Sequence, residues 1–334
     1  MAHRTTRFGG SRTDPYATSL RQWSNFMRVL DERGLTVAEL ERRTGSQEQL
    51  EGMRRWGYVT IAPDHEDTRA KPPARDHVVT PTAKGRRAQE VWRPLPETIE
   101  TRWRERFGSN NVQALRDALQ AIKDELGLAL PQFLTQHYGG YVNEPPKNPP
   151  DDGADPLPLS ALLSQVLHAF ALEYERDAKA SLCYSANILR LLDEDGIKVA
   201  QLPRRSGVAV EQIRTALGIL AKRGFITVAS DPQTRARQAR LTANGLEGRD
   251  LYRELPGEIE AHWEHRFDPG AVARLRTLLE GLATATAITP GSSEPAPLWL
   301  GLEPPPGTWR SQIPPPAALP HFPMPRQSGH PDGA

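Results

Sequence analysis

The sequence predicts a mainly α-helical protein with small β-wings, in which two copies of one unit are joined by long helices. An internal repeat predicts the two copies, and a recurring order of short helices and strands predicts the unit. Stripes of apolar residues at helical spacing after each copy predict the long helices.

The internal repeat is the most informative feature of the chain. Ser19–Leu40 aligns with Ser181–Leu202 at a constant offset of 162 positions. Further along, Thr82–Gly85 aligns with Thr242–Gly245 at an offset of 160. A match this long, with small and ordered changes of offset, indicates a duplication rather than chance.

Proline content marks where the folded units end. The 334-residue chain holds 31 prolines, six of them in Gly139–Pro158 and 13 from Pro290 to Ala334. Such stretches carry too little apolar surface to offset their ordering entropy. We therefore expect a flexible N-terminal arm at 1–18, repeat 1 at 19–138, a Pro-rich linker at 139–158, repeat 2 at 159–285 and a Pro-rich disordered tail at 286–334.

Repeat 2 shows the elements of the unit most clearly. Its pattern predicts helices at Ala186–Asp195, Val199–Arg205 and Val210–Arg223, a strand at Phe225–Ala229 and a polar hairpin tip at Asp231–Arg240. Three helices followed by a two-stranded wing are the order of a winged helix-turn-helix unit. Repeat 1 follows the same order, so the sequence predicts two such units.

Two further helices follow each unit and resemble helices that pack against a partner. Their apolar stripes are Val112, Leu115, Leu119, Ile122 and Leu126 in repeat 1, and Val272, Leu275, Leu279 and Leu282 in repeat 2. Pro96 and Pro256 fall at matching places, where we expect each to kink or interrupt its helix.

The segment GVAVEQIRTALGILAKRGFITVASDP (207–232), followed by a wing, LTANG (241–245) and long helices, resembles MarR-type winged helix-turn-helix transcriptional regulators. The resemblance covers Ser160–Ala285 more closely than Ser19–Leu126. Members of that family are normally dimers with one winged helix per chain, so the resemblance implies a fused pseudodimer that binds double-stranded DNA. It leaves open whether the chain acts as a monomeric pseudodimer or forms a homodimer.

Positive charge is concentrated in repeat 2. Lys198–Arg240 holds nine basic and two acidic residues, whereas the whole chain has a net charge of +1. Such a concentration favours the phosphate backbone of duplex DNA. The candidate DNA-binding residues are Arg204, Arg205, Gln212, Arg214, Thr215, Arg235, Arg237 and Arg240. Gln212, Arg214 and Thr215 have the groups that read base edges in the major groove, and the resemblance implies a minor-groove role for Arg235 at the wing tip.

Repeat 1 has lost this charge. Thr36–Thr80 holds seven basic and eight acidic residues. Its recognition helix is predicted to be shorter by more than one turn and its wing to be longer. We expect weak, different or no DNA contact here, and the remaining candidates are Arg54, Arg55, Arg69 and Lys71.

Several other residues have side chains of the types found at redox, metal or ligand sites. Cys183 has no basic neighbour that clearly lowers its pKa, which favours a buried, inert thiol over a redox sensor. His262 and His265 lie three apart on a helix without an evident third ligand, which favours surface residues over a metal site. Six aromatic residues are expected to serve the core more than a small-effector pocket, although the resemblance implies an aromatic effector: Trp23, Trp56, Trp92, Trp103, Tyr252 and Trp263.

Several classes of function are not supported by the sequence. It contains no Gly-rich phosphate loop, HExxH or GxSxG motif, so we expect no enzymatic activity and no cofactor. A single cysteine and the absence of a secretory h-region or membrane-length apolar run predict a cytoplasmic protein without a membrane partner. Two hypotheses remain: a DNA-binding transcriptional regulator dominated by repeat 2, or a protein-interaction scaffold that retains the fold without specific DNA binding.

Overall fold

The computed structural model describes residues 20–45, 50–128, 130–133, 136–137, 140–141, 156–193, 195–230, 235–284 and 320–324. Over these residues the chain is mainly helical with small antiparallel sheets, as the sequence predicts. The expected N-terminal arm and most of the predicted linker and tail lie outside the described residues.

The first head consists of the elements before residue 93 in repeat 1. They are α1 (Leu20–Ser24), η2 (Met27–Val29), β1 (Leu35–Thr36), α2 (Val37–Thr44), α3 (Leu50–Arg55), β2 (Val59–Ala62), η3 (Ala74–Asp76), β3 (Val78–Pro81) and α4 (Ala83–Trp92). The sheet has the order β1-β3-β2, with β3 antiparallel to both neighbours. Met53, Tyr58 and Val79 are fully buried and form a small core that belongs to this head alone.

The second head has the same order of elements. They are α8 (Leu182–Asn187), η4 (Leu189–Leu191), β6 (Ile197–Lys198), η5 (Val199–Gln201), α9 (Leu202–Ser206), α10 (Val210–Lys222), β7 (Ile226–Ser230) and β8 (Arg237–Leu241). Its sheet order, β6-β8-β7, matches that of the first head. Its core is continuous with that of the long helices, so this head is packed more firmly onto the rest of the molecule.

One predicted helix of the second head is wrong. A helix was expected at Ala186–Asp195, but α8 ends at Asn187 and is followed by a 3-10 turn and an extended Leu192. The run Ile188, Leu189 and Leu192 is apolar on more than one side, and the turn lets all three side chains reach the core with at most 2% exposure. Tertiary burial thus overrides the helical spacing.

Five long helices form the body between the heads. They are α5 (Leu95–Phe107), α6 (Ser109–Leu126), α7 (Leu159–Asp177), α11 (Ala243–Arg266) and α12 (Ala271–Thr284). The last helices of the two repeats, α6 and α12, pack against each other, and α7 lies against α5, α6 and α11. The predicted apolar stripes face these contacts and are buried, except for Leu279, which is 39% exposed.

The matched prolines have different outcomes. In repeat 1 the helix stops at Trp92 and restarts at Leu95, with Pro96 in the first turn of α5, where its missing N–H is not needed. In repeat 2 the helix α11 continues through Pro256, so of the two expected effects, a kink or an interruption, the interruption does not occur there. Leu255 and Ile259 on either side of this proline are buried, and their packing holds the helix together.

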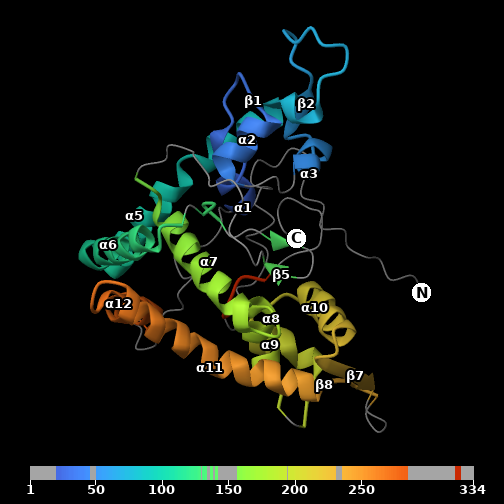
Figure 1. The fold of residues 1–334 in the computed structure, drawn as a ribbon, viewed down its shortest axis with the longest axis vertical. Coiled ribbons are helices and arrows are strands. Elements are labelled where there is room, and N and C mark those ends of the chain that lie inside the picture. The colour runs from blue at the N-terminus through green and yellow to red at the C-terminus, as the bar shows by residue number, and fades with distance from the viewer. Residues whose placement is uncertain are drawn as a thin grey trace, which may run out of the picture.

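The two heads lie at opposite ends of the long axis of the molecule, with the body between them (Figure 1). The helices α3 and α10 lie on the same side of that axis, away from α6 and α12. None of the helices among the described residues has the length and apolar character needed to cross a membrane.

A buried ion pair joins the repeats. Glu100, 8% exposed, accepts hydrogen bonds from Arg116 at 2.7 Å and from the backbone N–H of Leu159 at 2.7 Å, at the start of α7. Because this carboxylate serves an unpaired N–H of the first helical turn, it fixes where α7 begins against the body of repeat 1. At the matching positions of repeat 2, Glu260 pairs with Arg276.

Candidate nucleic-acid interface

The helix α10 is amphipathic in the way the sequence predicts. Ile213, Ala216, Leu217 and Leu220 are at most 3% exposed and form its inner face. The outer face carries the exposed Arg214, while Gln212 and Thr215 are half-buried at its edge. The helix is 13 residues long and follows a tight turn in which Gly207 is left-handed.

The three candidates for reading bases are not equally available. Arg214 forms an exposed ion pair with Glu211 at 2.8 Å, an interaction that is weak in water and easily exchanged for another anion. Gln212 instead donates from Nε2 to the backbone oxygen of Met324 at 3.4 Å. The C-terminal segment therefore reaches the edge of α10 that carries Gln212, which the sequence did not predict.

The basic residues of the second head come from four of its elements. Lys198, Arg204, Arg205, Lys222, Arg223, Arg235, Arg237 and Arg240 are all exposed. Within the described part of the chain, no ion pair involves any of them. Since phosphate affinity depends on cations that are not neutralised internally, this head has the charge available that a polyanion requires.

The wing of the second head places two of the predicted arginines on different faces of strand β8. Ala239 of β8 is fully buried and marks the inner face of the strand. Arg240 lies on the opposite face, where it donates to Gln238 at 3.1 Å, whereas Arg237 shares the parity of Ala239 and extends beyond the core at the strand end. Arg237 and Arg240 thus leave the strand on opposite faces.

Arg235 has an unusual backbone. Its φ of 55° is left-handed, and among the described residues it alone shows a positive φ without being glycine. Such a conformation stores about 1 kcal/mol of strain and occurs most often at turns and functional sites. This conformation was not predictable from the residue type, because the residue is neither glycine nor asparagine.

The first head has its arginines paired with acids. Its helix α3 has six residues, against the 13 of α10, in agreement with the predicted shortening. Arg54 is paired with Glu51 at 2.8 Å, and Arg55 lies over the Trp56 ring at 5.5 Å. In α2, hydrogen bonds from Arg42 and Arg43 lower the pKa of Glu39 to about 2.

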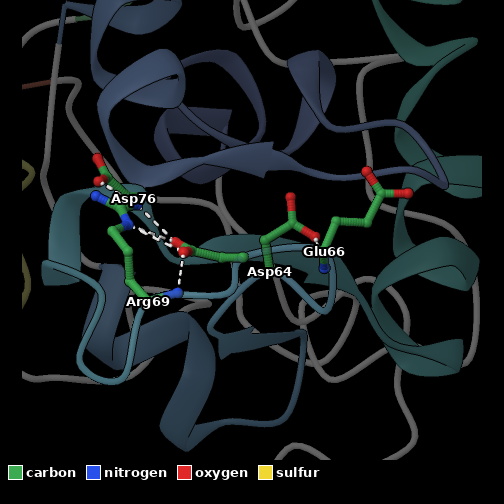
Figure 2. Close-up of polar contacts among 5 residues, drawn as sticks. Asp64, Glu66, Arg69 and Asp76 are labelled. Carbon is green, nitrogen blue, oxygen red and sulfur yellow. Dashed lines mark hydrogen bonds and ion pairs between the residues drawn. The ribbon is translucent and has the colours of Figure 1, made fainter.

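The long wing of the first head holds the clearest internal pairing. The Arg69 guanidinium contacts Asp67 at 2.6 Å and Asp76 at 2.8 Å, and Figure 2 shows it directed at Asp76. Hydrogen bonds from Arg69 lower the pKa of Asp67 to about 2, and the two carboxylates raise the pKa of Arg69. Of the two candidates in this wing, Lys71 is exposed and forms no ion pair among the described residues. Arg69 is held by the two carboxylates of its own wing.

The remaining predicted residues are placed as follows. Cys183 is fully buried, and burial raises its pKa to about 12, so the thiol is inert as expected. Nδ1 of His262 lies 3.3 Å from Glu173, whereas His265 bonds to the Ala261 oxygen, so the two rings have separate partners. Both belong to the surface of α11.

The aromatic residues serve mainly the core. Trp23 and Trp92 stack at 6.5 Å in the first head, and Trp263 is 3% exposed in the body. Trp56, Trp103 and Tyr252 are half-buried. A large cavity of about 850 Å³ is bounded by α6, α7, α11 and α12. Of the six predicted aromatic residues, Trp263 alone lines it, and the paired Glu260 and Arg276 also belong to its lining.

Sequence reasoning missed a second piece of the repeat. ALPQF (129–133) and ALPHF (318–322) match, and in both repeats the described part of the segment contacts an asparagine of the head, Asn25 or Asn187. Pro320–Met324 lies inside the predicted disordered tail, yet Phe322 is 3% exposed and belongs to the core. The identity of four residues in five was the available signal, and the high proline content hid it.

No protein-family model, curated protein or solved structure matches this chain.

Proposed function

We propose that the chain is a DNA-binding transcriptional regulator in which two fused winged-helix heads face duplex DNA and the second head dominates. In this proposal α10 enters the major groove and the wing of the second head contacts the adjacent minor groove. The matching strand orders of the two heads support the winged-helix interpretation, because in each head two strands follow the third helix and pair with a short strand that precedes the second helix.

The proposal depends mainly on one observation: the two heads differ in how many of their cations are neutralised by ion pairs within the head. Of the exposed cations between Lys198 and Arg240 in the second head, Arg214 alone forms an ion pair among the described residues. The first head instead binds Arg42, Arg54 and Arg69 to its own carboxylates. Releasing Arg69 for a phosphate would require breaking two ion pairs, so the first head gains less from DNA. The protein therefore favours an asymmetric site with one strong and one weak half.

The fused body sets the geometry of the pair. Because α6 of repeat 1 packs against α12 of repeat 2 within one chain, the heads are held together without a bimolecular step. The cavity of about 850 Å³ lies in this body, is lined mainly by apolar side chains such as Leu163, Phe170 and Leu275, and has the volume for a small aromatic effector. A ligand that wedges there would act on the spacing of the heads.

The test compares matched wing variants in a DNA titration. Arg235→Ala with Arg237→Ala removes two cations from the second wing, and Arg69→Ala with Lys71→Ala removes two from the first. Binding of a fluorescent duplex from the promoter next to the gene is measured by anisotropy at several salt concentrations. We expect the second-wing variant to lose at least about tenfold in affinity and up to roughly two units of salt slope, and the first-wing variant to change less than about threefold.

A second pair of variants separates base reading from phosphate contact. Gln212→Ala and Arg214→Ala should change the preference among duplex sequences more than the total affinity for mixed DNA. Equal losses in both wings would refute the dominance of the second head. Failure of the chain to bind any genomic fragment at low salt would refute the regulator and favour the protein-interaction scaffold.

A further inference from the structure

The described ends of the two repeats bind their heads through matching asparagines. In repeat 1, the backbone N–H of Phe133 donates to Oδ1 of Asn25 and the Phe133 oxygen accepts from its Nδ2, both at 2.9 Å. In repeat 2, the His321 N–H donates to Oδ1 of Asn187 at 3.0 Å, and the Phe322 oxygen accepts from its Nδ2 at 2.8 Å. Each asparagine thus binds one backbone donor and one backbone acceptor of the segment.

Both asparagines are buried in their heads, and their side-chain amides bind the segment. Asn187 is fully buried at the end of α8, and besides the segment its amide bonds only the Cys183 oxygen at 2.9 Å among the described residues. Asn25 is 4% exposed at the matching position, offset by 162. A buried carboxamide without partners is unfavourable, so each head requires an occupant that presents backbone groups at this place.

The two occupants differ in how they are attached. In repeat 1 residues 127–129 alone separate α6 from Leu130, and the Leu130 oxygen is also held by Gln165 of α7 at 2.6 Å. In repeat 2 a stretch of about 35 residues, 285–319, separates α12 from Pro320. The first occupant is therefore fixed by its neighbours in the chain, whereas the second is held by what it touches at its docking site.

The second occupant also touches the base-reading edge. Beside the Asn187 contacts, Phe322 is buried in the core and Met324 accepts a hydrogen bond from Gln212 of α10. The segment lies beside α8, near the middle of the molecule between the two heads (Figure 1). Docking of the segment thus affects the position of the Gln212 side chain, which contacts DNA bases in the proposed function.

We propose that Pro320–Met324 is an exchangeable internal ligand of the second head, and that the site around Asn187 is a receptor for peptides that contain a Pro-x-Phe sequence. While docked, the segment holds Gln212 and restrains base reading; once displaced, it frees this edge of α10. The effect on DNA rests on the proposed function, whereas the peptide site does not.

The experiment uses the full chain and a fluorescent peptide, AALPHFPM. Phe322→Ala weakens the internal ligand and should let the labelled peptide bind saturably, in the micromolar range. In the unsubstituted chain the internal segment competes at an effective concentration on the order of 1 mM, so peptide affinity should be about 10- to 100-fold weaker. Phe133→Ala is the matched control, and because its segment is closely tethered it should open no peptide site.

Each outcome decides the question. The same peptide with alanine in place of its phenylalanine should not bind Phe322→Ala. Equal binding to both chains, or no binding to a folded Phe322→Ala chain, would overturn the proposal. Loss of folding by Phe322→Ala, judged by circular dichroism, would show that the segment is a fixed part of the core and would also overturn it.

A DNA titration is run on the same two chains. Phe322→Ala should bind its preferred duplex about three- to tenfold more tightly if docking restrains Gln212. Peptide binding without this change would limit the proposal to a peptide site with no effect on reading. Absence of DNA binding by both chains would refute the proposed function while the peptide result stands on its own.

Discussion

A buried histidine in the body predicts a specific dependence of stability on pH. His168 of α7 is 1% exposed, and neither ring nitrogen has a hydrogen-bond partner among the described residues. Burial lowers its pKa from 6.5 to about 4, because the charged ring would lose its hydration. Above pH 6.5 the ring is neutral in both the folded and the unfolded chain, and its protonation does not affect stability.

The sign and size of the effect follow from linkage. As the pH falls below 6.5 the unfolded chain takes up a proton that the folded chain refuses, so the free energy of unfolding falls. The loss is about 2 kcal/mol at pH 5 and approaches roughly 3 kcal/mol near pH 4, where the folded ring begins to protonate. Stability is therefore fully present above pH 6.5 and lost on acidification.

The substitution His168→Met removes this titration and keeps an apolar side chain of similar size. Urea unfolding followed by circular dichroism at pH 7, 6 and 5 gives the free energy of unfolding of each chain. The difference between variant and unsubstituted chain should widen by about 2 kcal/mol from pH 7 to pH 5. Parallel pH profiles for His168→Met and the unsubstituted chain would refute the reasoning.

Three further outcomes are expected. Cys183 should resist alkylation by iodoacetamide in the native chain at pH 8 and react only after unfolding, because its pKa is raised to about 12; rapid native labelling would contradict its burial. Glu100→Ala removes the carboxylate partner of Arg116 and the acceptor of the Leu159 N–H, and it should reduce the free energy of unfolding by about 2–4 kcal/mol, whereas exposed Glu97→Ala should change it by less than about 0.5 kcal/mol in the same urea assay. Arg235→Gly relieves a left-handed backbone at φ 55° and should leave stability unchanged or raise it by up to about 1 kcal/mol while DNA affinity falls; a large loss of stability would show that the side chain serves the fold.

Much of the fold could be predicted because the spacing of apolar residues along the chain indicates where the helices form and which faces they bury. The stripe from Val112 to Leu126 and the inner face of α10 follow a period of 3.6 residues, and both are buried as predicted. The same reasoning failed at Ala186–Asp195, where apolar residues on several sides satisfy a helix and a buried turn equally well. It also left open whether Pro256 kinks or interrupts its helix, and α11 is not interrupted there, since packing on either side compensates one missing hydrogen bond.

The candidate site could be predicted only in its composition. The sequence located the basic residues of the second head, and it ranked the first head lower by counting acids. It did not indicate that Arg69 is held by Asp67 and Asp76, because the choice of a partner depends on the path of the wing. It also treated Arg237 and Arg240 as one group, although the strand turns them to opposite faces.

By itself the sequence determined that the protein is a duplication, where its helices carry apolar faces and which copy keeps its positive charge. These properties depend on residue type and on separations of a few positions, within which the backbone geometry is nearly fixed. The tertiary structure decided which charges neutralise one another and how the distant Phe322 reaches Asn187, 135 positions away. Contacts over such separations depend on loop closure and on competition among many apolar surfaces, which no local pattern encodes.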